Sequence, residues 1–342
     1  MIGQRHIAGN VIKLTITGWL FAIAAVLLGP TSDANAQPAT KAHRIGWLGD
    51  GSAPTVADRN AGDFQQALRD LGYVEGPNFI IDYRYANGNL DRLPELANQL
   101  VLLKVDVIVT SGESAALAAK RASNAIPVVA TELATDPVKG GIVASLGRPE
   151  ANITGLATQS EALWQKRLGV FKQITPKVGR IALLWNPANP GNLACTNEVK
   201  GAASALGLQV TLQDARDASA LERSFAAVTR DRPDALVACW DSFTLTHARR
   251  IAEFALRERL PTLAPVKEYV EAGMLMSLGA SLSAHRRRSA YYVDKLLKGA
   301  KPGSLPVEQA AQFDLVLNVG TAKALGLSPP SAVLLLADDL VQ

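Results

Sequence analysis

Polar and small residues follow the predicted strands of this sequence, and they are the side chains best suited to hold a ligand. They occur in both halves of the chain: Asp50 and Ser52; Ser111, Gly112 and Glu113; Thr131, Glu132 and Asp136; Asn186 and Asn189; Asp241 and Ser242. In open parallel sheets, ligands bind beyond the carboxyl ends of the strands. Any one of these residues could instead be a helix cap or a turn residue. Their recurrence in both halves predicts a binding site.

The chemistry of these residues indicates a small zwitterionic ligand. Ser52, Ser111 and Thr131 offer hydroxyls, and the helix starts nearby offer backbone N–H groups that favour an anionic group. In the second half, Asn186 and Asp241 could hold the opposite end of the ligand, with the Asp241 carboxylate on an ammonium. An amino acid or an aromatic carboxylate would satisfy such a site.

Tryptophan placement adds an apolar surface to the same positions. Trp47, Trp185 and Trp240 lie at or next to the carboxyl ends of predicted strands. An indole ring offers a large apolar face with one N–H donor, which suits a planar ligand. For Trp47 and Trp240 we weigh this role evenly against packing under a helix, whereas Trp185 is expected to be a core residue.

Residue patterns typical of enzymes are missing from the sequence. The four histidines have no metal-ligand spacing, and there is no GxSxG elbow and no Walker motif. The Gly-rich stretch 46–51 does not match GxGxxG, so it is a weak candidate for a dinucleotide site. We therefore expect a binding protein with no catalytic residue, no metal and no cofactor. The run Arg286 to Arg288 is expected to be a solvated helix face or a contact with a partner.

Composition places the chain among ordinary globular proteins. It has 342 residues, 48% of them hydrophobic and 19% charged, and a formal net charge of +4. The length favours two domains, and a weak charge without a clustered basic patch gives no reason to expect nucleic-acid binding. The two cysteines, Cys195 and Cys239, could form a bridge in an oxidising compartment. Two buried free thiols are the favoured expectation.

The first 36 residues read as a secretory signal. Arg5 and Lys13 precede an apolar run over 14–28, and Ala34-Asn35-Ala36 supplies small residues before a cleavage point at Gln37. The alternative is a membrane anchor, but the run is shorter than the roughly 20 residues that span a bilayer. No cysteine lies near the cleavage point to carry a lipid anchor. We therefore expect a periplasmic protein.

Strands and helices alternate along the rest of the chain, in two α/β units of similar size. Strands are expected at 44–48, 79–83, 105–109, 126–130, 180–185, 208–212, 235–240, 262–264, 274–278 and 313–317. Helices are expected at 58–71, 90–103, 111–123, 160–174, 189–207, 220–230, 244–259 and 289–297. This alternation predicts an α/β fold with doubly wound parallel sheets.

Several stretches resemble one family, the substrate-binding proteins of ABC transporters, in the branch that includes tryptophan-binding members. They are 136–138 with 141–146 and 148–149, then 152–155, 186–189, 291–302, 305–309 and 321–327. The resemblance covers about 43–340 and implies a type I periplasmic-binding-protein fold, in which two lobes are joined by a three-crossover hinge with the ligand in the cleft between them. The implied lobes are 43–156 plus 281–311, and 157–280 plus 312–342.

The sequence therefore predicts an extracytoplasmic protein that captures a small solute and delivers it to an inner-membrane ABC permease. A periplasmic sensor, which presents the bound solute to a membrane receptor without transport, is the alternative. The sequence does not identify the ligand.

Overall fold

The computed structural model describes residues 42–53, 59–158 and 163–342. The expected signal and its cleavage point at Gln37 lie outside these residues. Within the described ranges, no helix is both long enough and apolar enough to cross a membrane.

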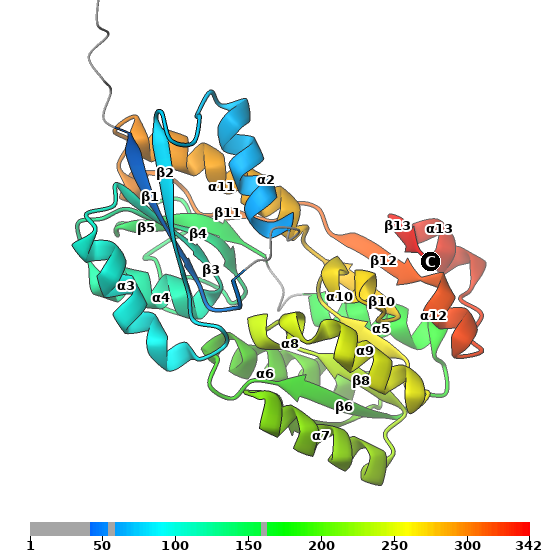
Figure 1. The fold of residues 1–342 in the computed structure, drawn as a ribbon. Coiled ribbons are helices and arrows are strands. Elements are labelled where there is room, and N and C mark those ends of the chain that lie inside the picture. The colour runs from blue at the N-terminus through cyan, green and yellow to red at the C-terminus, as the bar shows by residue number, and fades with distance from the viewer. Residues whose placement is uncertain (1–41, 54–58, 159–162) are drawn as a thin grey trace, which may run out of the picture. The chain divides into compact units, whose positions relative to one another are not determined.

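The first sheet has six parallel strands (Figure 1), in the order β11-β5-β4-β3-β1-β2. Its strands are β1 (His43–Gly49), β2 (Phe79–Tyr85), β3 (Val107–Ser111), β4 (Val128–Leu133), β5 (Ile153–Ala157) and β11 (Glu308–Gln309). Its helical elements are α2 (Arg59–Asp70), η1 (Leu90–Arg92), α3 (Leu93–Leu102), α4 (Glu113–Ala122), α11 (Leu282–Leu297) and η3 (Pro302–Ser304). Apolar side chains of α3 and α4 cover one face, and those of α2 and α11 cover the other. The inner strands β3, β4 and β5 are buried on both faces, which explains the apolar run at 107–109.

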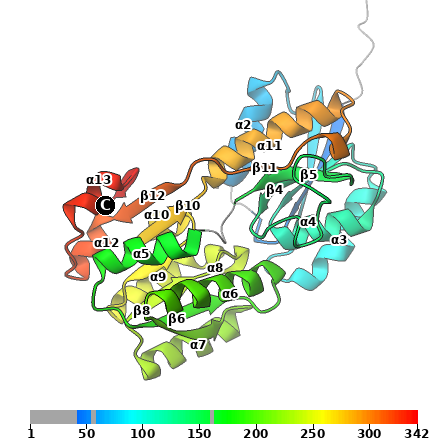
Figure 2. The ribbon, with the colours of Figure 1, turned by 180° about the vertical axis from the view of Figure 1, so that it is seen from behind.

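The second sheet has seven strands (Figure 2), in the order β13-β12-β10-β9-β8-β6-β7. Its strands are β6 (Arg180–Trp185), β7 (Gln209–Asp214), β8 (Ala235–Ala238), β9 (Thr262–Ala264), β10 (Met276–Gly279), β12 (Asp314–Asn318) and β13 (Asp339–Val341). Its helices are α5 (Trp164–Ile174), α6 (Pro190–Ala205), α7 (Ala218–Asp231), α8 (Ser242–Thr246), α9 (Ala248–Arg257), α10 (Lys267–Glu271), α12 (Val319–Ala324) and α13 (Ser331–Leu336). Residues of α5, α6, α12 and α13 pack on one face, and residues of α7, α9 and α10 on the other.

The chain passes between the two sheets three times. It leaves the first sheet after β5, returns after β10 into α11, and leaves again between β11 and β12. Helix α11 packs beside α2 on the first sheet, as Figures 1 and 2 both show. Because β12 arrives from the other sheet without a crossover helix, it pairs with β10 antiparallel. The expectation of parallel strands is therefore wrong for the pair β10–β12.

Three other local expectations need correction. The helix expected at 244–259 is two helices, α8 and α9, that meet at His247. The sequence did not predict strand β5. In the structure it is part of the first sheet, where Gly155 packs tightly against the backbone of Ala130. Helix α11 begins at Leu282, with Ser281 as its N-cap, so it is longer than expected.

The two cysteines form a disulfide, which corrects the expectation of free thiols. Cys195 lies in the first turns of α6, and Cys239 directly follows β8. Both residues belong to the apolar core between α5, α6 and the second sheet. Sequence could not decide the question because, at a sequence separation of 44, it does not show how closely α6 approaches the end of β8.

Candidate ligand-binding site

A cleft of about 780 Å³ lies at the carboxyl ends of strands from both sheets. Its first side is formed by Trp47, the loop at Gly51–Ala53, Tyr85 and Ser111, which end or follow β1, β2 and β3. Its second side is formed by Trp240, Ser242 and residues of α8, α9 and α10, and Arg286 of α11 completes it. This is the position that ligands occupy in open parallel sheets.

Trp47 and Trp240 are both part of the cleft wall. The Trp47 ring packs on Phe64, with ring centroids 5.3 Å apart, and only 2% of the residue is exposed. Trp240 is half-buried. The indole nitrogen of each is buried and has no hydrogen-bond partner. Because a buried donor is normally paired, two unpaired N–H groups beside one cleft indicate a place where a ligand can accept hydrogen bonds.

A charged cluster lies at the cleft, where Arg286 and Glu268 are among the lining residues and Glu132 lies behind them. The Arg286 guanidinium is 3.6 Å from Glu132 Oε1, at the end of β4, and 3.9 Å from Glu268 Oε1, in α10. Ser111 Oγ donates to Glu132 Oε2 at 3.1 Å. Burial raises the pKa of Glu268, although the nearby Arg286 opposes the shift. The ion pairs of this cluster thus connect β4 and α11, which belong with the first sheet, to α10, which packs on the second.

Asp50 and Ser242 form a direct hydrogen bond across the cleft. Ser242 Oγ, at the start of α8, donates to Asp50 Oδ1, which follows β1. Asp50 is 1% exposed, and burial raises its pKa to about 8, with the carboxylates of Asp241 and Glu132 adding to the shift. The Asp50 carboxyl group also fills the space where Gly112 would otherwise carry a side chain.

This carboxyl group makes the stability of the folded chain depend on pH. Unfolded, Asp50 releases its proton at the ordinary value of 3.8, whereas in the folded chain it does so at about 8. The folded state therefore binds more protons between these values. Its stabilising contribution is complete below pH 3.8 and is lost as the pH rises toward 8, by about 1.4 kcal/mol for each pH unit.

We expect Asp50→Asn to remove this dependence. The amide is isosteric with the protonated acid and can still accept from Ser242. The wild type should lose free energy of unfolding as the pH rises, and the variant should not. The difference between the two should therefore shift in favour of the variant by about 3 kcal/mol from pH 5 to pH 7. Urea unfolding of both proteins at the two pH values measures the difference, and Glu258→Gln, at an exposed position, is the control. Parallel pH profiles for wild type and Asp50→Asn would show that Asp50 is ionised in the folded chain.

Asn186, Asn189 and Asp241 form a hydrogen-bonded group beside the cleft but are not among the residues that line it. Asp241 Oδ2 accepts from Asn189 Nδ2 at 2.9 Å and from Asn186 Nδ2 at 3.2 Å. Asp241 Oδ1 accepts from Phe243 N at 2.9 Å, so the residue is the N-cap of α8. Both oxygens are thus occupied, and the geometry favours the helix-cap alternative over a contact with a ligand ammonium.

Three further candidates of the first half are also paired within the protein. Glu113 accepts from Thr135 N and Oγ1 at 2.9 and 2.8 Å, and Thr131 Oγ1 donates to Thr110 O at 2.9 Å. Asp136 accepts from Val138 N at 2.9 Å in a turn. Of the fourteen predicted site residues, those that line the cleft are Trp47, Ser52, Ser111, Trp240 and Ser242. Asp50, Gly112 and Glu132 lie behind this lining and support it through the contacts described above.

Arg286, Glu268 and Tyr85 line the cleft but were not predicted to do so. The run Arg286 to Arg288 was a visible signal, and its interpretation as a solvated face is wrong for Arg286, which is 4% exposed. Its neighbours do lie at the surface, where Arg287 pairs with Asp70 and Arg288 pairs with Glu308.

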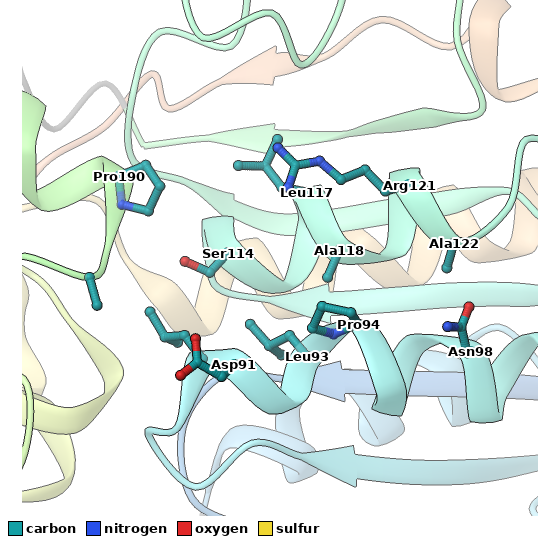
Figure 3. Close-up of a pocket in the computed structure, with 12 residues that line it drawn as sticks. Asp91, Leu93, Pro94, Asn98, Ser114, Leu117, Ala118, Arg121, Ala122 and Pro190 are labelled. Atoms are coloured by element: carbon teal, nitrogen blue, oxygen red, sulfur yellow. The ribbon is translucent and has the colours of Figure 1, made fainter.

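A second cavity, of about 360 Å³, lies along α3 and α4 and reaches Ala188, just before α6, and Pro190, the first residue of α6. Figure 3 shows its lining, with Leu93, Leu117 and Ala118 on the two helices and Arg121 at the edge. None of the predicted site residues lines it. Because it has neither the aromatic residues nor the charge cluster of the larger cleft, we take the larger cleft as the ligand site.

Metal-binding chemistry finds no support in the parts of the chain that the structure describes. Among these residues, no group of three or more His, Cys, Asp or Glu side chains is placed to hold a metal ion.

Comparison with known proteins identifies a family. The model for "ABC transporter substrate binding protein" matches residues 53–341. A tyrosine-binding protein of Clostridioides difficile is 25% identical over 275 residues, covering 80% of this chain and 79% of that protein.

Two solved structures are also similar to the chain. A conserved domain protein of Vibrio cholerae is 28% identical with a TM-score of 0.80, over 88% of this chain and 100% of its own. An ABC domain of Streptococcus pneumonia in complex with L-Trp is 24% identical with a TM-score of 0.80, over the same shares. The predicted α/β fold of type I periplasmic binding proteins is confirmed by these and other structural neighbours.

The family and the named relative are binding proteins rather than enzymes, as the sequence predicts. The match of the family model over residues 53–341 shows that this chain belongs to the family of ABC transporter substrate-binding proteins.

Proposed function

We propose that this protein captures an aromatic amino acid in the cleft and delivers it to an inner-membrane ABC permease. The observation that carries the proposal is that one cleft combines two features. It has two indole N–H groups without hydrogen-bond partners, on Trp47 and Trp240, and a buried charge cluster. Aromatic walls suit a planar side chain, and charges of both signs suit a zwitterion. The relatives support this choice, since one is named a tyrosine-binding protein and another was solved with L-Trp.

The periplasm is the proposed compartment, and the signal over residues 1–36 is the proposed route to it. Family membership supports an extracytoplasmic position. The disulfide between Cys195 and Cys239 is in keeping with an oxidising compartment.

Lobe closure is the proposed mode of capture. We assign lobe 1 to 43–156 plus 281–311 and lobe 2 to 157–280 plus 312–342. The Asp50–Ser242 and Arg286–Glu268 contacts join Asp50 and Arg286 of the first of these lobes to Ser242 and Glu268 of the second. Closure around a ligand of this kind is one of the common two-domain motions.

Calorimetric titration tests the proposal. The chain from Gln37 onward should bind L-tryptophan or L-tyrosine with one site and a Kd in the micromolar range or below, and D-ribose should give no heat. A protein that binds the sugar and neither aromatic amino acid would contradict the proposed ligand class.

Ligand binding is expected to change the tryptophan fluorescence of the protein. L-tyrosine is used as the ligand, and the excitation wavelength is longer than those that tyrosine absorbs. Trp240→Phe should remove at least about half of the change, because this half-buried indole lines the cleft. Trp185→Phe is the matched control, since this ring packs against the core of the second sheet. If Trp47→Phe and Trp240→Phe both leave the full signal, neither indole senses the ligand.

A further inference from the structure

Arg286 is the most buried positive charge among the residues that line the cleft, and its burial is only partly compensated. Its side chain is 4% exposed, and its two acidic neighbours, Glu132 and Glu268, are 1% and 19% exposed. The three side chains come from α11, β4 and α10, so residues of both sheets contribute. Placing charges away from water is unfavourable unless they are paired and hydrogen-bonded.

The hydrogen bonds of this cluster are incomplete. Separations of 3.6 and 3.9 Å are ion-pair contacts but are longer than the 2.7–3.2 Å of an N–H···O hydrogen bond. Arg286 Nε, Glu132 Oε1 and Glu268 Oε2 are buried and have no hydrogen-bond partner. The cluster therefore has one unpaired donor and two unpaired acceptors, contributed from both sides of the cleft.

Other arginines of the chain show what complete pairing looks like. Arg288 donates twice to Glu308, at 2.8 and 2.6 Å. Arg167, which is 1% exposed, donates to Leu278 O at 2.5 Å and stacks on the Trp164 ring. Arg286 differs from both because its Nε faces no acceptor although the side chain is buried.

We propose that Arg286 binds the α-carboxylate of the ligand and that Glu268, with Glu132 behind it, binds the α-ammonium, so that the cleft selects a free amino-acid head group. The inference rests on the proposed function and assigns the part of the site that reads the head group. Trp47 and Trp240 are left to contact the side chain of the ligand.

Charge balance favours a zwitterion over the alternatives. With one arginine and two glutamates, the cluster carries a formal charge of −1 when all three groups are ionised. A zwitterion leaves this charge unchanged and supplies an acceptor to Arg286 and donors to the glutamates. A carboxylate without an amine would add a second negative charge, and a sugar hydroxyl would form hydrogen bonds in which only the protein partner is charged.

Ligand analogues on the wild-type protein give the first test, because they need no mutation. We expect calorimetry to show tryptamine, which lacks the carboxylate, and indole-3-propionate, which lacks the amine, each binding about tenfold to a hundredfold more weakly than L-tryptophan. Equal affinity of tryptamine and L-tryptophan would overturn the assignment of Arg286 while leaving the proposed function in place.

Arg286→Met gives the second test, with Arg287→Met as its matched control on the next residue of the helix. The first variant should lose about tenfold to a hundredfold in affinity for L-tryptophan but lose much less for tryptamine, which has no carboxylate to offer. Arg287 pairs with Asp70 at the surface, so its replacement should stay within about twofold. A loss that is equal for both ligands would show a structural role and overturn the proposal.

Two further arrangements keep the outcomes separate. If Arg286→Met does not fold, as judged by circular dichroism, Arg286→Lys takes its place, because lysine keeps the charge but not the planar fork. L-leucine is titrated beside the aromatic ligands. Binding of L-leucine but not of L-tryptophan or L-tyrosine, with the amide of L-leucine rejected, would remove the aromatic part of the proposed function and support the head-group assignment.

Discussion

Replacing Cys195 and Cys239 together by Ala is expected to lower the free energy of unfolding by about 4 kcal/mol. The bridge closes a loop with a sequence separation of 44 residues, and the entropy that it removes from the unfolded chain grows with the length of the loop. The loop contains most of α6, all of β7 and α7, and β8. One covalent link therefore restrains a large part of the second sheet.

Urea unfolding of oxidised wild type and of the double variant measures this effect. The wild type in the presence of reductant should approach the variant, and the variant should not respond to reductant. A thiol reagent provides the control, since both cysteines of the chain are in the bridge. Two reactive thiols in the unreduced, denatured protein would contradict the bridge.

Gly112→Ala is expected to destabilise the chain by about 4 kcal/mol, and by much more than a similar change elsewhere. Gly112 precedes α4 with φ +96° and ψ 145°, a backbone conformation populated almost only by glycine, which costs an L-residue about 1–3 kcal/mol. A Cβ atom there would also lie 1.9 Å from Asp50 Oδ2. Relieving this overlap must move either α4 or the carboxyl group that meets Ser242, and overpacking of this kind adds about 1–3 kcal/mol.

Gly72→Ala is the matched control for this change. Gly72 has φ +89°, close to that of Gly112, but a Cβ atom there meets nothing within 4 Å. It should therefore cost only the backbone term, about 1 kcal/mol. Thermal and urea unfolding of the two variants separates backbone strain from steric overlap. Equal losses would show that the Asp50 carboxyl group moves aside without cost.

Elements with strong local signals could be predicted from the sequence. Strand β6 lies where it was expected, at Arg180–Trp185, and α6 begins with Asn189 as N-cap and Pro190 at its first position, as predicted. These features depend on neighbouring residues alone. The antiparallel β12 could not be predicted, because its direction is set by the passage of the chain from the other sheet.

The same distinction explains the outcome at the site. Trp47, Ser111 and Ser242, which line the cleft, could be named as candidates because a strand end or helix start marks them in the local sequence. Arg286 was missed because its burial depends on Glu132 and Glu268, which are far from it in the chain. For Asp241 the sequence left two alternatives, since a strand-end carboxylate has the same signal whether it faces a ligand or caps a helix, and in the structure it is the N-cap of α8.

The side chains of the three successive arginines of α11 point in three different directions. Consecutive residues of a helix are rotated by about 100° from one another, so Arg286 reaches the cleft, Arg287 reaches Asp70 of α2, and Arg288 reaches Glu308 of β11. The rotational phase of the helix thus decides which of the three arginines reaches the cleft. Inserting or deleting one residue between Gly279 and Arg286 would turn the helix by the same angle. A deletion would then bring Arg287 toward the cleft and an insertion would bring His285 there. The segment before α11 therefore tolerates changes of side chain far better than changes of length.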